Sequence, residues 1–139
     1  MDARPYHPPD RDACLALLRE RAPAQEPDFA AYLISEPTGF FLLEHAGELL
    51  ACGGIQHSSP EADELVWGMV RPQWERQGVG RYLLLLRTRQ ARAPFLDVTV
   101  PQAYAAFYEK AGFRRQSESS SPAESSNQVQ LRKKLSVCP

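Results

Sequence analysis

Apolar positions along the chain follow two kinds of repeat, separated by breaks that contain proline or glycine. Between Asp10 and Pro23 they recur at helical spacing, with Asp10 able to cap the first turn and Pro23 ending the helix. The same spacing predicts three further helices, at 27–36, from the glycine-containing loop to about 92, and at 101–111. Shorter apolar runs predict seven strands, at 3–6, 39–45, 49–56, 63–70, 95–100, 113–116 and 128–135.

Some positions refine this expected architecture. Gly53 and Gly54, inside one expected strand, suggest a β-bulge. The stretch 117–127 is rich in Ser, Glu and Pro and is expected to form a mobile loop. The last strand, 128–135, is expected to close the sheet as an edge strand. No internal repeat is visible, and 139 residues suffice for one core, so residues 1–139 are expected to form a single domain.

The most informative stretch joins the fourth strand to the third helix. A proline-containing turn follows the strand, and Gly78 and Gly80 stand where the helix begins. Because glycine has no Cβ, a ligand can approach this backbone closely. The free N–H groups of 77–81 point outward with the positive end of the helix dipole, and phosphate is the usual occupant of such a site. Arg76 and Arg81 flank the loop and can add charge-assisted hydrogen bonds.

The loop departs from the two best-known phosphate-binding motifs. A nucleoside-triphosphate P-loop ends in Gly-Lys-Ser/Thr, whereas Gly80 is followed by Arg81 and Tyr82. A dinucleotide-binding fingerprint needs a third small residue where this chain has Leu83. On the two glycines alone, an ordinary helix-capping turn explains the loop equally well. The ligand therefore has to be identified from the longer context.

That context forms a recognisable pattern over roughly residues 2–116. Its parts are Glu64-Leu65-Val66-Trp67, then Val70-x-Pro72 ahead of Gly78-x-Gly80, then Phe107-Tyr108-Glu109-Lys110-Ala111-Gly112-Phe113. Together they resemble the GNAT superfamily of acyl-CoA-dependent N-acetyltransferases. The resemblance implies an α/β protein with the GNAT fold, in which a mixed central sheet of about seven strands carries about four helices on both faces.

The resemblance also implies a donor site. Acetyl-CoA would be the cosubstrate, without a metal ion, and the coenzyme A pyrophosphate would bind the loop residues Arg76, Gln77, Gly78, Val79, Gly80 and Arg81. The family pattern has Gln or Arg where this chain has Glu75. Because a carboxylate repels a pyrophosphate, Glu75 is expected to point away to solvent.

In the family, the pantetheine arm runs beside the fourth strand, as an added strand would. The resemblance therefore implies that the thioester lies near Met69 and Val70, where a free N–H can stabilise the tetrahedral oxyanion. Gly68 leaves room for such a ligand, although a β-bulge explains this glycine equally well.

Acetyl transfer needs a proton acceptor and a proton donor. An alkylamine with a pKa of about 10 is almost fully protonated at neutral pH, so a base has to remove its proton. Glu64 stands where many family members hold a catalytic glutamate, with a solvated strand-end carboxylate as the alternative interpretation. Asp63 is a weaker candidate for the base and is interpreted as part of the turn. Tyr108 matches the family tyrosine before Gly-Phe and can protonate the departing thiolate, with helix packing as the alternative.

Composition limits the partners and the compartment. The net charge is −1, so bulk electrostatics favours neither a nucleic-acid nor a membrane partner. The three cysteines lie far apart, without metal-ligand spacing or a disulfide framework, and no signal peptide is visible. This pattern predicts a cytoplasmic protein. The three histidines and the arginines at 87, 89 and 92 are interpreted as surface residues.

Two functional classes remain open. The leading hypothesis is an N-acetyltransferase that moves an acetyl group from acetyl-CoA to a primary amine of a small molecule, peptide or protein. Transfer would be direct, in a ternary complex. Dimers are common in the family, so a homodimer is one of the open oligomeric states. The alternative is a non-catalytic acyl-CoA-binding sensor or interaction module on the same fold. Amine-dependent release of thiol from acetyl-CoA distinguishes them.

Overall fold

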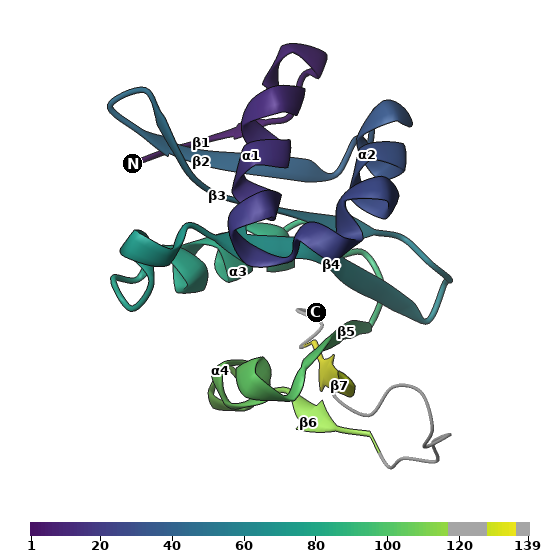
Figure 1. Cartoon of the computed structure of the whole chain (residues 1–139). Coiled ribbons are helices and arrows are strands. Elements are labelled where there is room, and N and C mark those ends of the chain that lie inside the picture. The colour runs from purple at the N-terminus through teal and green to yellow at the C-terminus, as the bar shows by residue number, and fades with distance from the viewer. Residues whose placement is uncertain (117–127, 136–139) are drawn as a thin grey trace. The chain divides into compact units, whose positions relative to one another are not determined.

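The computed structural model describes residues 1–116 and 128–135. Within them, four helices and seven strands follow the predicted order (Figure 1). The helices are α1 (Arg11–Arg21), α2 (Glu26–Ile34), α3 (Val79–Thr88) and α4 (Ala105–Lys110), and none of these is both long and apolar enough to cross a membrane. The strands are β1 (Asp2–Pro5), β2 (Phe40–His45), β3 (Glu48–Gln56), β4 (Ala62–Val70), β5 (Phe95–Pro101), β6 (Arg114–Arg115) and β7 (Gln128–Lys134). The expected mobile loop at 117–127 lies outside the described residues.

The strands form one mixed sheet in the order β1-β2-β3-β4-β5-β7-β6. The β4–β5 pair is parallel, and the β1–β2, β2–β3, β5–β7 and β6–β7 pairs are antiparallel. The predicted α/β fold class is thus confirmed. The chain forms two compact units, which we describe separately. The first unit comprises Met1–Ile55 with Trp67–Gln90, and the second comprises Gln56–Val66 with Ala91–Pro139.

In the first unit, helices cover both faces of the sheet. Figure 1 shows α1 and α2 on one side of β2 and β3, and α3 on the other. Neighbouring residues of β2 divide between the two faces: Leu42 belongs to the α1/α2 core and Leu43 to the core beneath α3. Because both faces are buried, β2 and β3 read as nearly continuous apolar runs rather than as alternating ones.

Gly53 and Gly54 mark close approaches of side chains and not the expected bulge. Both pair in regular register with β2, and the register shift of this hairpin lies elsewhere in the ladder. A Cβ on Gly53 would lie 3.1 Å from Cζ of Arg87, and a Cβ on Gly54 would lie 2.5 Å from Oη of Tyr32. The two glycines therefore make room for large side chains that pack on opposite faces of β3.

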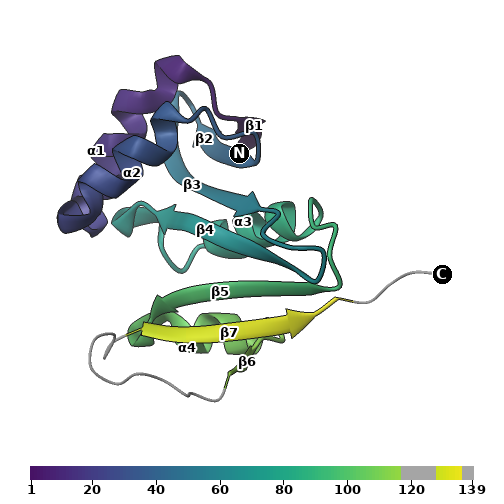
Figure 2. The ribbon, with the colours of Figure 1, turned by 90° about the vertical axis from the view of Figure 1, so that its right-hand side faces the viewer.

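In the second unit, β7 lies between β5 and β6, so the expectation of an edge strand at 128–135 is wrong. Figure 2 shows β7 running alongside β5, and their paired residues extend from Phe95 with Lys134 to Pro101 with Gln128. The edge strand is β6, which has two residues, both arginine. A very short, charged edge discourages pairing with a further strand.

Candidate functional site

The loop between β4 and α3 leaves the start of the helix open. The N-cap of α3 is Gly78, whose φ of +86° lies in the left-handed region that glycine adopts without strain. No described side chain caps this end, and the first helical hydrogen bond runs from Tyr82 N–H to Gly78 O. A Cβ on Gly78 would meet no atom within 4 Å. The first N–H groups of α3 therefore have no side-chain cap in the described part of the chain, and an anion can accept their hydrogen bonds.

Positive side chains flank this loop. Arg76 and Arg81 are both exposed, and neither forms an ion pair with any residue that the structure describes. Arg76 has a φ of +64°, which winds the backbone tightly just before the helix. Gln77 Nε2 donates to Gln73 O at 3.1 Å and so bridges the turn. The loop thus combines N–H donors with two guanidinium groups that have no counter-ion among the described residues.

Glu75 is partly exposed, as expected, but it is also bound to the protein. Its Oε2 lies 2.8 Å from Nη2 of Arg21 in α1, and its side chain is 41% exposed. The family pattern led us to expect only a solvent-facing carboxylate here. The ion pair compensates part of the negative charge beside the loop, which reduces the repulsion that an anionic ligand would meet.

Strand β4 is irregular at its centre. Trp67 has a φ of +53°, an unusual backbone conformation for a bulky residue, and its ring packs on Phe29 with centroids 4.8 Å apart. Gly68 is exposed, whereas Met69 is buried in the α1/α2 core and Val70 is half-buried. The strand therefore exposes its main chain at Gly68, next to the two residues expected near the thioester.

Glu64 lies on β4 in the second unit and is half-buried. It is paired with Asp97 of β5, so the two carboxylates are neighbours on one face of the sheet. Asp97 accepts hydrogen bonds from Arg132 Nε at 2.7 Å and from Nη2 at 3.0 Å. The Glu64 side chain has no hydrogen bond or ion pair within the described part of the chain. Its oxygens are therefore available to accept a proton.

Asp63, in contrast, is a structural carboxylate. Its Oδ1 lies 2.7 Å from Nδ1 of His57, and Oδ2 accepts hydrogen bonds from the N–H groups of Arg92 at 2.6 Å and Ala93 at 3.0 Å. Burial raises the pKa of Asp63, but these hydrogen bonds outweigh it, so the net pKa lies below the ordinary value. Asp63 thus holds the turn that leads into β5, and His57 is a partner of Asp63 rather than a plain surface residue.

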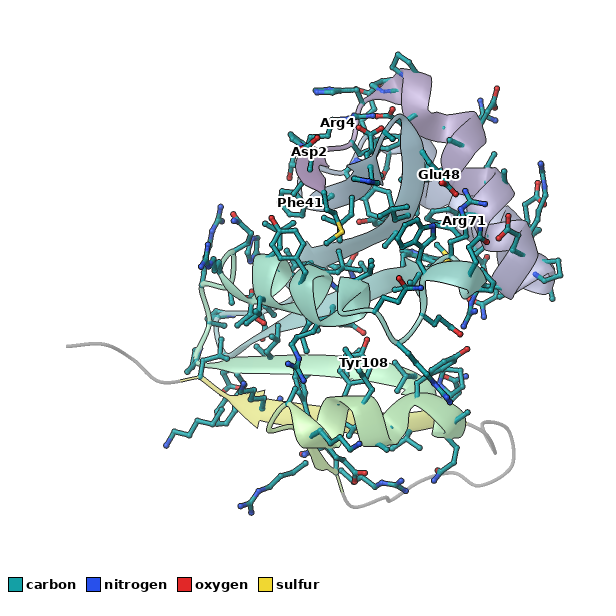
Figure 3. All side chains as sticks on the ribbon, turned by 90° about the vertical axis from the view of Figure 1, so that its left-hand side faces the viewer. Asp2, Arg4, Phe41, Glu48, Arg71 and Tyr108 are labelled. Atoms are coloured by element: carbon teal, nitrogen blue, oxygen red, sulfur yellow. The ribbon has the colours of Figure 1, made fainter. Side chains whose placement is uncertain are left out.

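Tyr108 is fixed by aromatic contacts within α4 and just beyond it. Its side chain projects from α4 (Figure 3), and the residue is 8% exposed. The ring meets those of Phe107 and Phe113 edge-on, with centroids 5.0 and 5.5 Å apart. Phe113 N–H also donates to Tyr108 O at 3.0 Å, after the left-handed turn at Gly112. These contacts hold the phenol ring in one orientation, as a positioned proton donor requires.

The predicted site residues fall into two groups. Met69, Val70 and the loop 76–81 lie together in the first unit, at the end of β4 and the start of α3. Glu64 and Tyr108 belong to the second unit, on β4 and α4. The residues predicted to bind the pyrophosphate therefore lie in the first unit, and the two predicted for proton transfer lie in the second.

Arg87 is a buried residue that the sequence interpretation missed. It was expected on the solvated face of its helix, but it is only 2% exposed. Its position could have revealed this, because Arg87 follows Leu83 by one helical turn and Val79 by two, and both are buried. A charged residue in register with an apolar stripe belongs to the buried face.

The sequence matches a family model described as "Acetyltransferase (GNAT) domain" over residues 36–115, more than half of the chain. No curated protein sequence shows a significant match.

Several solved structures share the fold. N-acetylglutamate synthase from Neisseria gonorrhoeae, complexed with coenzyme A and N-acetyl-glutamate, is 24% identical with a TM-score of 0.81, covering 98% of this chain and 35% of that one. An aminoglycoside 6'-N-acetyltransferase complexed with coenzyme A is 13% identical with a TM-score of 0.82, and the match covers 100% of this chain and 99% of that one. A GNAT-like decarboxylase in complex with isobutyryl-CoA is 18% identical with a TM-score of 0.76, and the match covers 96% of this chain and 99% of that one. This chain spans about a third of the synthase's length.

Proposed function

Because the chain belongs to the GNAT family of acetyltransferases and is an acyltransferase, we propose that it moves an acetyl group from acetyl-CoA to a primary amine. Transfer is direct, within a ternary complex. The observation that carries the proposal is the uncapped start of α3 at Gly78, between two arginines. It offers N–H donors and positive charge together, and a pyrophosphate binds through both.

The loop residues fit the pyrophosphate of the donor. The N–H groups of 77–81 provide the hydrogen bonds, and Arg76 and Arg81 provide charge. The space beside Gly78 is open, whereas a larger side chain at this position would fill it. Glu75 does not prevent binding, because Arg21 already compensates part of its charge.

The end of β4 guides the acyl group. In this proposal, the main chain of Met69 and Val70 lies along the pantetheine arm, and a free N–H there donates to the carbonyl oxygen. The exposed main chain at Gly68 supports this assignment. Such a donor gains most when negative charge develops on the oxygen, so it lowers the barrier more than it tightens substrate binding.

Glu64 acts as the general base and Tyr108 as the general acid. Glu64 accepts a proton from the amine, directly or through water, and the neutral nitrogen then forms a bond to the carbonyl carbon. The π electron pair of the carbonyl bond moves to its oxygen, and the C=O bond forms again as the carbon–sulfur bond breaks. Tyr108 donates its proton to the leaving thiolate. The nitrogen, which carries one extra proton after attack, gives it up to solvent as the amide forms. Tyr108 regains a proton from solvent, and Glu64 releases its own. The net result is an amide and a free thiol, with both side chains restored.

The acceptor is an amine on a small molecule, peptide or protein. Two proteins with the same fold have a small molecule in their names: N-acetylglutamate in the synthase and an aminoglycoside in the 6'-N-acetyltransferase. Amino acids and aminoglycosides are therefore the first compounds to screen, followed by peptides with free N-termini.

A fold shared with a GNAT-like decarboxylase does not by itself fix the reaction, so the non-catalytic sensor needs a direct test. Acetyl-CoA binding is measured by calorimetry, and thiol release is then followed with the amine panel. The proposal predicts binding and release that depends on one class of amine. Binding without amine-dependent release would favour the sensor.

A further inference from the structure

Arg87 places a positive charge inside the first unit with almost nothing to balance it. The residue is 2% exposed, and its one side-chain hydrogen bond in the described structure runs from Nη1 to Gly54 O at 3.3 Å. Its buried Nε has no hydrogen-bond partner. No carboxylate among the described residues forms an ion pair with it. The guanidinium is thus desolvated without the counter-ion that usually accompanies a buried charge.

The surrounding backbone is shaped to admit this side chain. A Cβ on Gly53 of β3 would lie 3.1 Å from Cζ of Arg87, and a Cβ on Gly68 of β4 would lie 2.9 Å from Nη2. Both distances are shorter than ordinary contacts, so a side chain at either position would displace the guanidinium. Arg87 therefore occupies, from α3, the space that side chains of two adjacent strands would otherwise fill.

Packing alone does not account for such a residue. Removing a charge from water costs stability unless good hydrogen bonds compensate it, and well-packed apolar residues often replace buried charges with a gain in stability. One long hydrogen bond and an unsatisfied Nε leave most of that cost in place. The charge is therefore better explained by what it does to its surroundings.

The field of Arg87 reaches the exposed part of β4. Nη2 lies against Gly68, which is exposed and follows the left-handed Trp67. Its influence also extends across the sheet. Its charge opposes the burial that raises the pKa of Tyr32, and it opposes the hydrogen bond with Cys14 and the burial that together raise the pKa of Cys52. An anion that forms beside Gly68 would meet the same positive potential.

We propose that Arg87 is a positioning residue for acyl transfer: it packs against Gly68 and supplies positive potential where the thioester oxygen becomes negative. This inference rests on the proposed function, which places the thioester beside β4. Arg87 acts from behind the strand and does not touch the substrate. Its effect belongs to the transition state, because the carbonyl oxygen carries much less charge before attack.

The first test compares Arg87→Met with the parent protein and with Arg89→Met, an exposed neighbour at the end of α3. Arg87→Met should lower kcat by about 10²-fold, within the range seen when one oxyanion-stabilising group is lost, with KM for acetyl-CoA unchanged. Its Tm should rise, and Arg87→Lys should recover part of kcat. Arg89→Met should behave as the parent. Unchanged kcat, or a lower Tm with kcat and KM altered together, would reduce Arg87 to a structural residue.

The second test needs no acceptor. Isotope-edited infrared spectra of bound acetyl-CoA, labelled at the carbonyl carbon, report how strongly the protein polarises that bond. The stretch should move to lower frequency in the parent protein and back toward the solution value in Arg87→Met, at equal affinity. The same frequency in both would overturn this inference alone, whereas failure of the parent protein to bind acetyl-CoA would overturn the proposed function as well.

A double-mutant cycle tests the geometry. Gly68→Ala places a Cβ against Nη2 and should lower kcat by itself. In the Arg87→Met background the added methyl should have little further effect, because the group that it displaces is gone. Independent, multiplicative losses would show that Gly68 and Arg87 do not act together.

Discussion

At the residue scale, neighbours in sequence have different roles because their surroundings differ. Asp63 and Glu64 are adjacent carboxylates on opposite faces of β4. Asp63 is buried with three hydrogen bonds, whereas the side chain of Glu64 is half-buried with none in the described residues. Strand alternation predicted the two faces from sequence alone. It did not predict the partners of Asp63, because His57 and the 92–93 turn come from separate loops.

Glu64→Gln tests the base. The variant keeps the size of the side chain and removes its ability to take a proton. The rate of transfer should fall by about 10²–10⁴-fold at low pH, where the amine is most protonated, and rise toward the parent rate as pH increases. Initial rates across pH are compared with those of Glu61→Gln, an exposed carboxylate three residues earlier. A loss of equal size at every pH would argue against proton abstraction.

Tyr108→Phe tests the acid. Phenylalanine preserves the ring contacts with Phe107 and Phe113 and removes only the hydroxyl. We expect kcat to fall by about 10²–10⁴-fold while the Kd for acetyl-CoA stays the same, since the proton is needed only as sulfur leaves. Steady-state rates and calorimetry on the same preparation measure both. A parent-like kcat would remove Tyr108 from the chemistry.

At the element scale, hydrophobic periodicity located the helices and strands, and the glycine-containing loop was recognised from local chemistry. Strand order was less accessible. The alternation in 128–135 identified a strand, but it did not show that β7 pairs with both β5 and β6. Gly53 and Gly54 were misinterpreted because their neighbours, Arg87 and Tyr32, approach from distant helices.

Gly78→Asp tests the donor loop, and Gly47→Asp is its matched control. Both glycines have a positive φ, +86° and +82°, and both have open space around the missing Cβ, so the backbone cost of substitution should be similar. Asp tolerates this conformation better than most residues. Only Gly78→Asp puts a negative charge at the start of α3. Calorimetry should show acetyl-CoA binding weakened by about 1.5–3 kcal/mol, the scale of a lost hydrogen bond to a charged group. Equal affinity in the two variants would place the pyrophosphate elsewhere.

Asp63→Asn tests how β4 is joined to the turn before β5. The folded state lowers the pKa of Asp63, so its ionised form contributes stability above the unfolded pKa of about 3.9, and that contribution is lost as pH falls through the folded value. At pH 7 the variant should lose about 1–3 kcal/mol of unfolding free energy in urea. Parent and variant should converge under acidic conditions. A difference that persists at low pH would assign the loss to packing instead.

At the scale of the whole molecule, the family pattern carried information that no single element holds. From the sequence alone it grouped Glu64, the loop at 76–81 and Tyr108 as one predicted site, and the family match covers 36–115. The buried charge of Arg87 lay outside that pattern. The burial of Arg87 depends on the packing of α3 against glycines of β3 and β4. Sequence reasoning about separate segments does not reveal such packing.

Direct transfer of acetyl from acetyl-CoA to an amine is best tested by following the acetyl group itself. Acetyl-CoA labelled in the acetyl carbons is mixed with the protein and an accepted amine, and the intact protein and the small molecules are weighed by mass spectrometry during the first turnover. Direct transfer predicts that the label appears on the amine in step with free thiol and never on the protein. Label on the protein before the amine, or thiol release without a labelled amine, would contradict it.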